Sequence, residues 1–293
     1  MARAKFFLVL FGGFAAPIYN GVEVRRCSHL LTYWTFFSKS FQRSAVYRLE
    51  AWSRVLGNLL TLLLWMTIWL ALYRGSGEIR SVSLESMVTY TAISQLLLSV
   101  NNAGMPLWVL QERVKTGEIG TEFIRPFDLP TRFLADELGS VCFYFLTAVL
   151  PLYALIFWWI EPTGPHSFSG YATFALSAVL GFLIRWSIEF TFGLFTFWLV
   201  ETGGVEDVFY FSISLLSGSL IPLWFFPAWL AQIAGWLPFQ AIFFIPNAIF
   251  VGQLQGGEVG IALLLQLFWL VVVYALMRWI WRLVQRKLVV HGG

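Results

Sequence analysis

Five stretches of the chain are apolar over the length that a helix needs to cross a lipid bilayer, which is about 20 residues. A sixth, shorter apolar stretch follows Asp207 and runs to about Leu220. The sequence therefore predicts an all-α integral membrane protein with six transmembrane helices. The five longer spans are Val55–Tyr73, Leu84–Gly104, Ser140–Ile160, Tyr171–Val200 and Ala262–Val284.

The composition agrees with a membrane location. Hydrophobic residues make up 58% of the 293 residues and charged residues 12%, whereas a soluble domain carries about 25% charged residues. The net charge of +3 is too small to indicate a nucleic-acid partner. Membrane lipid is the expected surrounding, and no nucleic acid is expected.

Residues 221–252 are apolar, but four prolines interrupt them. A proline inside a helix removes a backbone donor and costs about 3 kcal/mol. Broken backbone at membrane depth is tolerated where protein buries it or where it lines a water-filled cavity. We therefore expect re-entrant helices in this segment, between spans five and six, and not a seventh crossing.

The distribution of Lys and Arg predicts the orientation, because cytoplasmic loops are enriched in these residues. Of the 19 Lys and Arg residues, eight precede the first span, four lie between the second and third spans, and four lie at the end of the last span. Only Arg74 and Arg80 lie in loops expected outside. Both termini are thus predicted to be cytoplasmic in a multi-pass protein of the cytoplasmic (inner) membrane, which requires an even number of crossings.

The loop between spans two and three, residues 105–135, contains the polar segment RVKTGEIGTEFIRPFDLP, which begins at Arg113 and ends at Pro130. This segment combines several charges with two glycines and two prolines in an otherwise apolar chain. A short polar module that projects from a membrane bundle suits docking to a soluble partner. An ordinary solvated loop is the alternative.

Residues 33–54 are predicted to form an amphipathic helix in the headgroup plane. At 100° per residue, charged positions such as Lys39 and Arg43 fall within an arc of about 60°, and aromatic residues gather on the other side. Residues 1–32 form an N-terminal extension of unknown role. A signal peptide, an apolar extension lying on the membrane and a start codon placed too early all account for its apolar run.

Polar residues inside the predicted spans are candidates for a functional role, since such residues are costly in a bilayer. Arg185 and Glu189 lie four residues apart in span four and share a helix face, which allows an ion pair. Gln95, Asn101 and Asn102 lie in the second span. Two roles fit these five residues: they line a polar path, or they hold helices together.

Motifs of catalysis and cofactor binding do not occur in the sequence. There is no G-x-x-x-x-G-K-[ST] phosphate-binding loop and no nucleophile motif, and the three histidines are scattered. We therefore expect no catalytic, cofactor or metal site in this chain, and no enzymatic activity of its own.

Four features coincide in the sequence: the entry helix with VYRLEAW, the loop TGEIGTEFIRPFDLP, the run SGSLIPLWFFPAWL followed by WLPFQAIFFIPNAIFVGQ, and a final basic helix. Together they resemble permeases of the type-2 exporter family of ABC transporters. The branch of ABC-2 family transporter proteins, with members linked to multidrug or viologen export, is the most similar. The resemblance covers about residues 33–287.

The resemblance implies a six-span permease domain over residues 55–287 that works as a homo- or heterodimer. Two ATPase subunits, made as a separate chain, would bind the ATP. It also implies that loop 105–135 is the element that couples the permease to the ATPase. The implied contact residues are Gly117, Glu118, Ile119, Glu122, Phe123, Arg125 and Pro126.

The expected function is that of a permease subunit that exports a small amphiphilic or drug-like substrate. Two alternatives remain open on the sequence. One is a secondary, proton-driven transporter, and the other is a membrane-embedded protein that processes lipid or glycan.

Overall fold

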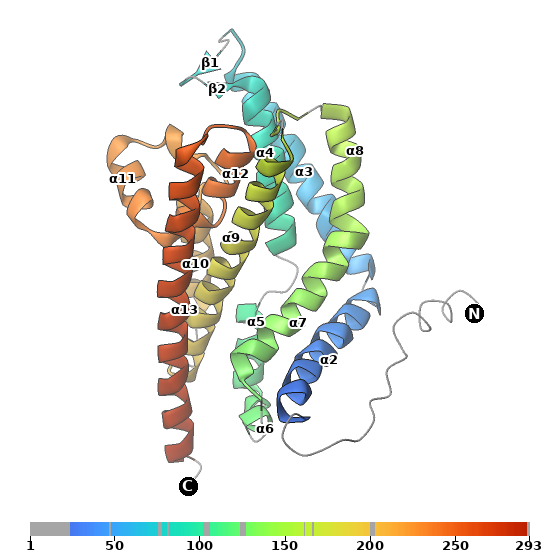
Figure 1. Cartoon of the computed structure of the whole chain (residues 1–293), viewed down its shortest axis with the longest axis vertical. Coiled ribbons are helices and arrows are strands. Elements are labelled where there is room, and N and C mark those ends of the chain that lie inside the picture. Colours follow the sequence, from blue (N-terminus) through green and yellow to red (C-terminus); the bar gives the residue numbers. More distant parts are fainter. Residues whose placement is uncertain are drawn as a thin grey trace, which may run out of the picture.

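The computed structural model describes residues 24–46, 48–75, 78–80, 82–101, 106–123, 127–160, 162–165, 167–199 and 203–291. These residues form an elongated bundle of helices (Figure 1). At one end, which we call the basic end, lie α5 (Pro106–Lys115), α6 (Ile119–Phe123) and the C-terminal part of α13 (Gly257–His291). At the other, the hairpin end, β1 (Glu78–Ile79) pairs antiparallel with β2 (Val82–Ser83).

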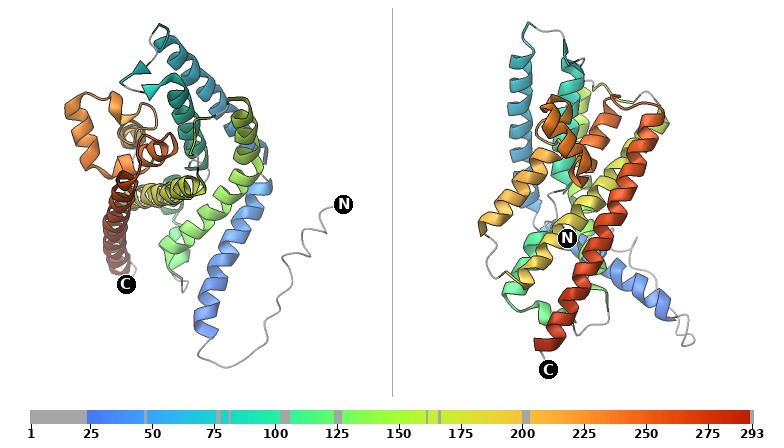
Figure 2. Two further views of the ribbon diagram at one scale, coloured as in Figure 1. Left: turned by 45° about the horizontal axis from the view of Figure 1, so that its top comes forward. Right: turned by 90° about the vertical axis from the view of Figure 1, so that its left-hand side faces the viewer.

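Each of the six predicted spans contains a helix, and consecutive spans alternate in direction between the two ends (Figures 1 and 2). The helices are α3 (Arg48–Leu72), α4 (Leu84–Asn101), α7 (Leu129–Tyr144) continued by α8 (Leu150–Ile160), α9 (Phe168–Leu194), α10 (Gly203–Leu216) and α13 (Gly257–His291). A π-helical turn, Phe145–Val149, joins α7 to α8 without ending the helix.

In the described part of the chain, four helical segments are long and apolar enough to cross a bilayer. They are Trp52–Leu72, Leu129–Trp159, Phe168–Phe197 and Gly257–Arg286. This confirms an all-α membrane protein. Helices α4 and α10 are shorter, at 18 and 14 residues, so the count of six crossings stays a prediction.

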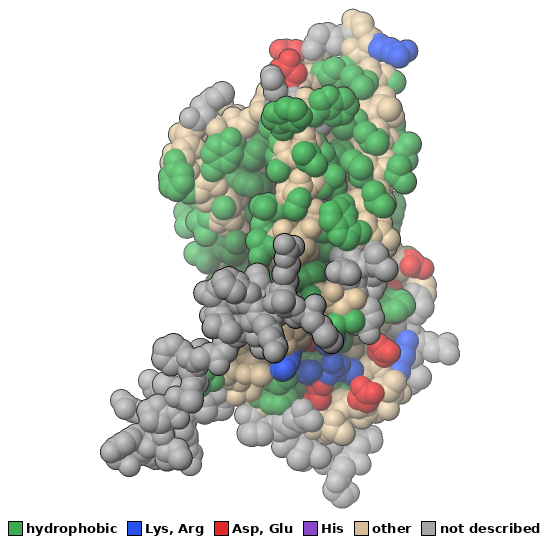
Figure 3. Space-filling model, turned by 90° about the vertical axis from the view of Figure 1, so that its right-hand side faces the viewer, with side chains coloured by type: hydrophobic (Ala, Val, Ile, Leu, Met, Phe, Trp, Pro, Cys, Tyr) green, Lys and Arg blue, Asp and Glu red, His purple; other side chains and the backbone are tan. Residues whose placement is uncertain are grey.

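The outer faces of the bundle are apolar. Hydrophobic side chains cover the broad upper part of the face in Figure 3, and charged side chains gather toward the basic end. In the apolar windows of α3 and α13, only 17% of the residues are buried within the protein. Surfaces of this kind need lipid or another protein to cover them.

Helix α2 runs from Val24 to Val46, so the predicted boundaries of 33–54 for the amphipathic helix are wrong at both ends. Residues 48–54 form the first turns of α3. Their charged side chains suggested an interfacial helix, but long charged side chains at the end of a span reach the interface. Residues 24–32 of the predicted extension are helical, and residues 1–23 lie outside the described part. The interfacial position of α2 stays a prediction.

Helix α2 packs alongside α7, as Figures 1 and 2 both show. The hydroxyl groups of Ser40 and Ser140 are hydrogen-bonded at 2.8 Å. Phe41 packs edge to face against Phe143, with ring centroids 5.3 Å apart. The described N-terminal part is therefore joined to the third predicted span.

The prolines of segment 221–252 do break it into short helices, α11 (Ala228–Trp236) and α12 (Phe244–Phe250). Both lie toward the hairpin end (Figure 1). The Gln266 amide of α13 donates to the Ala241 carbonyl at 2.7 Å, and the Asn247 amide donates to Ser94 of α4. These bonds hold the segment to two neighbouring helices, and its return to one membrane face stays a prediction.

Candidate functional site

Two short helices at the basic end form the polar loop. Gly117 ends α5 with a φ of 76°, a left-handed conformation that glycine adopts without steric cost. Its backbone N–H donates to the Val114 carbonyl at 3.2 Å. The chain then turns into α6, which has five residues.

The predicted contact residues divide into two groups. Gly117 and Glu118 are exposed, whereas Ile119 and Glu122 are buried and Phe123 is half-buried. The exposed residues form the outer surface of this loop, which we call the docking edge: Glu112, Lys115, Thr116, Gly117, Glu118, Gly120 and Thr121. Arg125 and Pro126 lie outside the described residues.

The buried carboxylate of Glu122 joins three helices. It forms ion pairs with Arg113 of α5 and with Arg132 of α7. The Arg132 guanidinium also lies over the Phe36 ring of α2, 5.0 Å from its centroid. We call Arg113, Glu122 and Arg132 the Glu122 clamp. It holds α6, which is too short to be stable alone, against the bundle.

Sequence reasoning assigned Glu122 to the partner contact and missed its two partners. Arg113 and Arg132 lie nine and ten residues from Glu122, beyond the spacing at which residues on one helix meet. The only signal was their charge, and the same loop holds other charged residues, such as Lys115 and Glu118, so the sequence does not single out this pairing.

Asp128 is a second junction at the basic end. It caps the N-terminus of α7 by accepting a hydrogen bond from the Thr131 N–H at 3.2 Å. Both of its carboxylate oxygens accept from Arg278 of α13, at 2.7 and 2.8 Å. Partial burial raises the pKa of Asp128, but the hydrogen bonds from Thr131 and Arg278 outweigh it and hold this pKa below its usual value.

Arg185 and Glu189 of α9 do form an ion pair, with Arg185 Nη2 2.6 Å from Glu189 Oε1. Both residues are buried. Arg185 also donates to the backbone carbonyl of Asn101, at the end of α4. The pair therefore ties α9 to α4, while Gln95 is buried elsewhere on α4 and Asn102 lies outside the described residues.

A third buried charge was missed by sequence reasoning. Glu137 of α7 is 6% exposed and lies close enough to Glu189 and Arg185 for electrostatic interaction. The sequence signal for its burial was its position, three residues before the predicted span 140–160. The observed helix α7 begins earlier, at Leu129, and includes Glu137. Two acids and one base thus lie together between α7 and α9.

The described residues contain no group of three or more His, Cys, Asp or Glu side chains placed to hold a metal ion. What the basic end offers is an exposed polar edge on a short helix that is fixed by buried ion pairs.

One comparison with known proteins bears on this arrangement. A family model described as "ABC-2 family transporter protein" matches residues 57–292, which is more than half of the chain. No curated protein matches the sequence. The match begins within α3 and includes the polar loop and all later helices.

Proposed function

The chain belongs to the ABC-2 family of transporters, and from this premise we propose that it is the membrane-spanning permease subunit of an ATP-driven exporter. A separate ATPase chain would bind and hydrolyse the ATP. The exported substrate would be small and amphiphilic or drug-like.

The docking edge is the observation that carries the proposal. It presents charged and small polar groups, among them Lys115 and Glu118, on the loop between two predicted spans. The Glu122 clamp fixes its position from behind. A preorganised polar surface loses little conformational entropy when a partner binds, which favours an ATPase subunit as the ligand of this edge.

The distribution of charge supports a cytoplasmic position for the docking edge. The exposed ends of α5 and α13 carry Lys115, Arg282 and Arg286, whereas Arg74 and Arg80 lie near the hairpin. On the positive-inside rule, the basic end faces the cytoplasm. Six crossings of the inner membrane then place both termini there.

A second permease protomer, identical or homologous, would complete the transporter. The exposed apolar faces of α3 and α13 provide surface for this contact as well as for lipid. In the cycle that we propose, ATP closes the pair of ATPase subunits and moves the docking edge. The permease pair then opens outward, and the substrate passes between the protomers.

The test is co-purification of the chain with an ABC ATPase, and the effect of Glu118→Lys on ATP-dependent export. Reversing the charge of an exposed docking residue should reduce export at least ten-fold and weaken co-purification, because a like charge opposes the partner. The control is Glu258→Lys, which makes the same change at an exposed residue at the start of α13, near the hairpin end.

Normal export and co-purification of Glu118→Lys would refute the docking role. An equal loss in Glu258→Lys would indicate general damage and refute it too. Purified chain that transports without any ATPase would overturn the whole proposal.

A proton-driven secondary transporter is the second candidate, and the buried carboxylates of Glu137 and Glu189 favour it. Acidic residues inside a membrane often belong to proton relays. On this hypothesis an uncoupler would abolish transport in cells that remain rich in ATP. The ATP-driven exporter would continue to work under the same conditions.

A further inference from the structure

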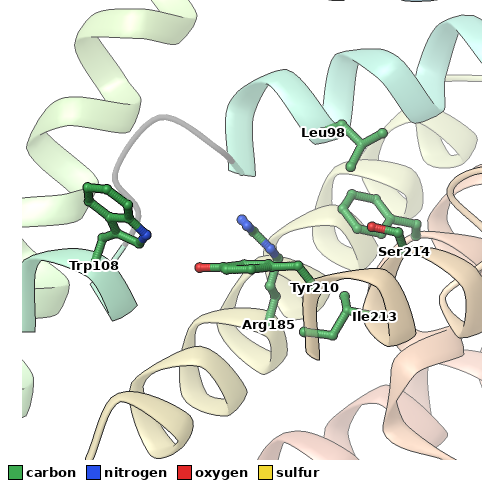
Figure 4. A pocket seen from close by; sticks show the side chains of 7 residues that line it. Leu98, Trp108, Arg185, Tyr210, Ile213 and Ser214 are labelled. Carbon is green, nitrogen blue, oxygen red and sulfur yellow. The ribbon is translucent and has the colours of Figure 1, made fainter. Parts of the chain in front are cut away.

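A cavity of about 300 Å³ lies in the middle of the bundle, beside the Arg185–Glu189 pair. Its walls come from α4, α5, α9, α10 and the segment before α12. Figure 4 labels six of its lining side chains: Leu98, Trp108, Arg185, Tyr210, Ile213 and Ser214. A volume of this size falls at the lower end of the range of small-molecule sites, which is about 300–1,000 Å³.

One side of the cavity is mainly apolar. Leu98 of α4, Ile213 of α10 and Phe243 form this wall. Ser214 of α10 adds one hydroxyl group to it. Ile213 and Phe243 are buried in the same hydrophobic cluster as α12 and α9 residues. An apolar cavity of about 150 Å³ accommodates a benzene ring. The cavity therefore has room, beside its apolar wall, for a molecule with roughly two fused rings or a short aliphatic chain.

The other side presents hydrogen-bond donors. In Figure 4 the Arg185 guanidinium, the Tyr210 hydroxyl and the indole nitrogen of Trp108 face one another across the space. Arg and Trp side chains have donors but no acceptor, and a tyrosine hydroxyl is also able to donate. A molecule that is to satisfy this wall needs an acceptor at its polar end.

The Arg185 side chain is held in a fixed position in this wall. It is 6% exposed and is held by Glu189 and by the Asn101 carbonyl, so the guanidinium cannot swing away without breaking two contacts. Glu189, Glu137 and Glu206 interact electrostatically with the lining residues Arg185 or Tyr210, and none of the three lines the cavity. Arg185 is thus the charged group among the described residues that line it.

We propose that this cavity binds an apolar molecule whose polar end is a hydrogen-bond acceptor, either a carboxylate or an uncharged carbonyl, and that it discriminates against organic cations. An acceptor is paired by Tyr210 and Trp108 and attracted by Arg185. An ammonium group lies against a guanidinium and cannot accept a hydrogen bond from Tyr210 or Trp108. Binding in this cavity does not depend on the proposed export route, which runs between the protomers.

The test uses three tritiated probes with the same naphthylbutyl body and different ends: a carboxylate, a methyl amide and a trimethylammonium. Equilibrium binding is measured on the purified permease in lipid nanodiscs without ATPase, with empty nanodiscs subtracted for partition into lipid. We expect the carboxylate or the amide to bind at least ten-fold more tightly than the trimethylammonium probe.

Three variants locate the site. Tyr210→Phe keeps the ring and removes the hydroxyl, and should weaken the better probe by about ten-fold, the size expected for loss of a hydrogen bond to a charged acceptor. Leu98→Trp should fill the cavity and abolish binding. Tyr274→Phe, at an exposed position on α13, should leave binding unchanged.

The inference is overturned if the trimethylammonium probe binds as tightly as the other two, if none of the probes binds above the empty nanodiscs, or if Tyr210→Phe and Leu98→Trp both bind like the wild type. Because the binding assay contains no ATPase, its failure leaves the docking proposal standing. Failure of the Glu118→Lys test would in turn not affect the inference that the cavity prefers ligands with a hydrogen-bond acceptor.

Discussion

Gly139 of α7 shows how closely two helices meet at the basic end. A Cβ atom added at Gly139 would lie 2.2 Å from the Phe37 carbonyl oxygen of α2 and 2.9 Å from the Ser40 Cβ. Small residues allow helix backbones in membranes to approach one another and gain dispersion contacts. No side chain beyond hydrogen fits at this crossing.

Gly139→Ala is therefore expected to destabilise the protein by about 1–3 kcal/mol, the cost typical of overpacking. The backbone of α2 has to move, because the nearest atom is a main-chain oxygen. Thermal unfolding in detergent measures the effect. Gly57→Ala on α3 is the matched control, since nothing lies within 4 Å of an added Cβ there; equal stability of the two variants would contradict the prediction.

The Arg185–Glu189 pair supports a second prediction. Arg185→Gln alone or Glu189→Gln alone leaves one buried charge without its partner, which costs about 3–5 kcal/mol. The double variant removes both charges of the pair and should lose clearly less than the sum of the two single changes. Thermal unfolding of all four proteins forms a double-mutant cycle, and additive losses would exclude a direct coupling.

Whether a contact between two side chains was predictable depended on how far apart the two residues lie in the sequence. The Arg185–Glu189 pair was foreseeable because residues four apart share a helix face. The partners of Glu122 and the burial of Glu137 depend on how α5, α6 and α7 fold together. Helical periodicity carries no information about contacts of that kind.

Among the helices, α7 depends on Asp128, which caps its N-terminus and pairs with Arg278 of α13. Asp128→Ala should lower stability by about 1–2 kcal/mol through the lost cap alone. Asp128→Asn should lose less, because asparagine is also a good N-cap residue. Arg278→Gln should remove the ion pair and keep the cap.

This contribution of Asp128 has a defined pH dependence. Its pKa in the folded protein is lowered, so the stabilisation is fully present above the unfolded-state pKa of about 4 and disappears as the pH falls through the folded value. The stability difference between wild type and Asp128→Ala should stay constant from pH 8 to pH 5 and shrink below about pH 4. A difference that shrinks between pH 7 and pH 5 would contradict this assignment.

Helix starts were predictable where a proline restricts the backbone. Pro227 precedes α11, and Pro246 lies in the first turn of α12, where helix N–H groups have no intrahelical partner. The boundary between α2 and α3 was not predicted, because Arg54 falls on the same face as Lys39 and Arg43 when the helix is extended to residue 54.

For the whole molecule, the predicted topology is tested by cysteine labelling of a variant in which Cys27 and Cys142 are replaced by serine. Single cysteines at Pro227 and Gln255 flank the α11–α12 segment and are exposed. Both should react with a membrane-impermeant reagent added outside. Thr116→Cys, on the docking edge, should react only after the membrane is permeabilised.

Labelling of Pro227→Cys and Gln255→Cys from opposite sides would mean that the segment crosses the membrane, and the count of six would be wrong. Labelling of Thr116→Cys from outside would reverse the orientation. The overall class of the protein was predictable, because apolar length and charge distribution decide it. The crossing count depends on α4 and α10, which have 18 and 14 residues, so apolar length alone does not decide it.

The Glu122 clamp has a mechanical consequence. A flexible loop would absorb a push from a bound partner as local bending, whereas a short helix pinned to α5 and α7 passes the displacement on. Beyond α6 the chain reaches Asp128, whose bond to Arg278 links α7 to α13. A displacement of the docking edge would thus move α7 and α13 together. The rigidity of these ion pairs would determine how much of that displacement reaches the other side of the membrane.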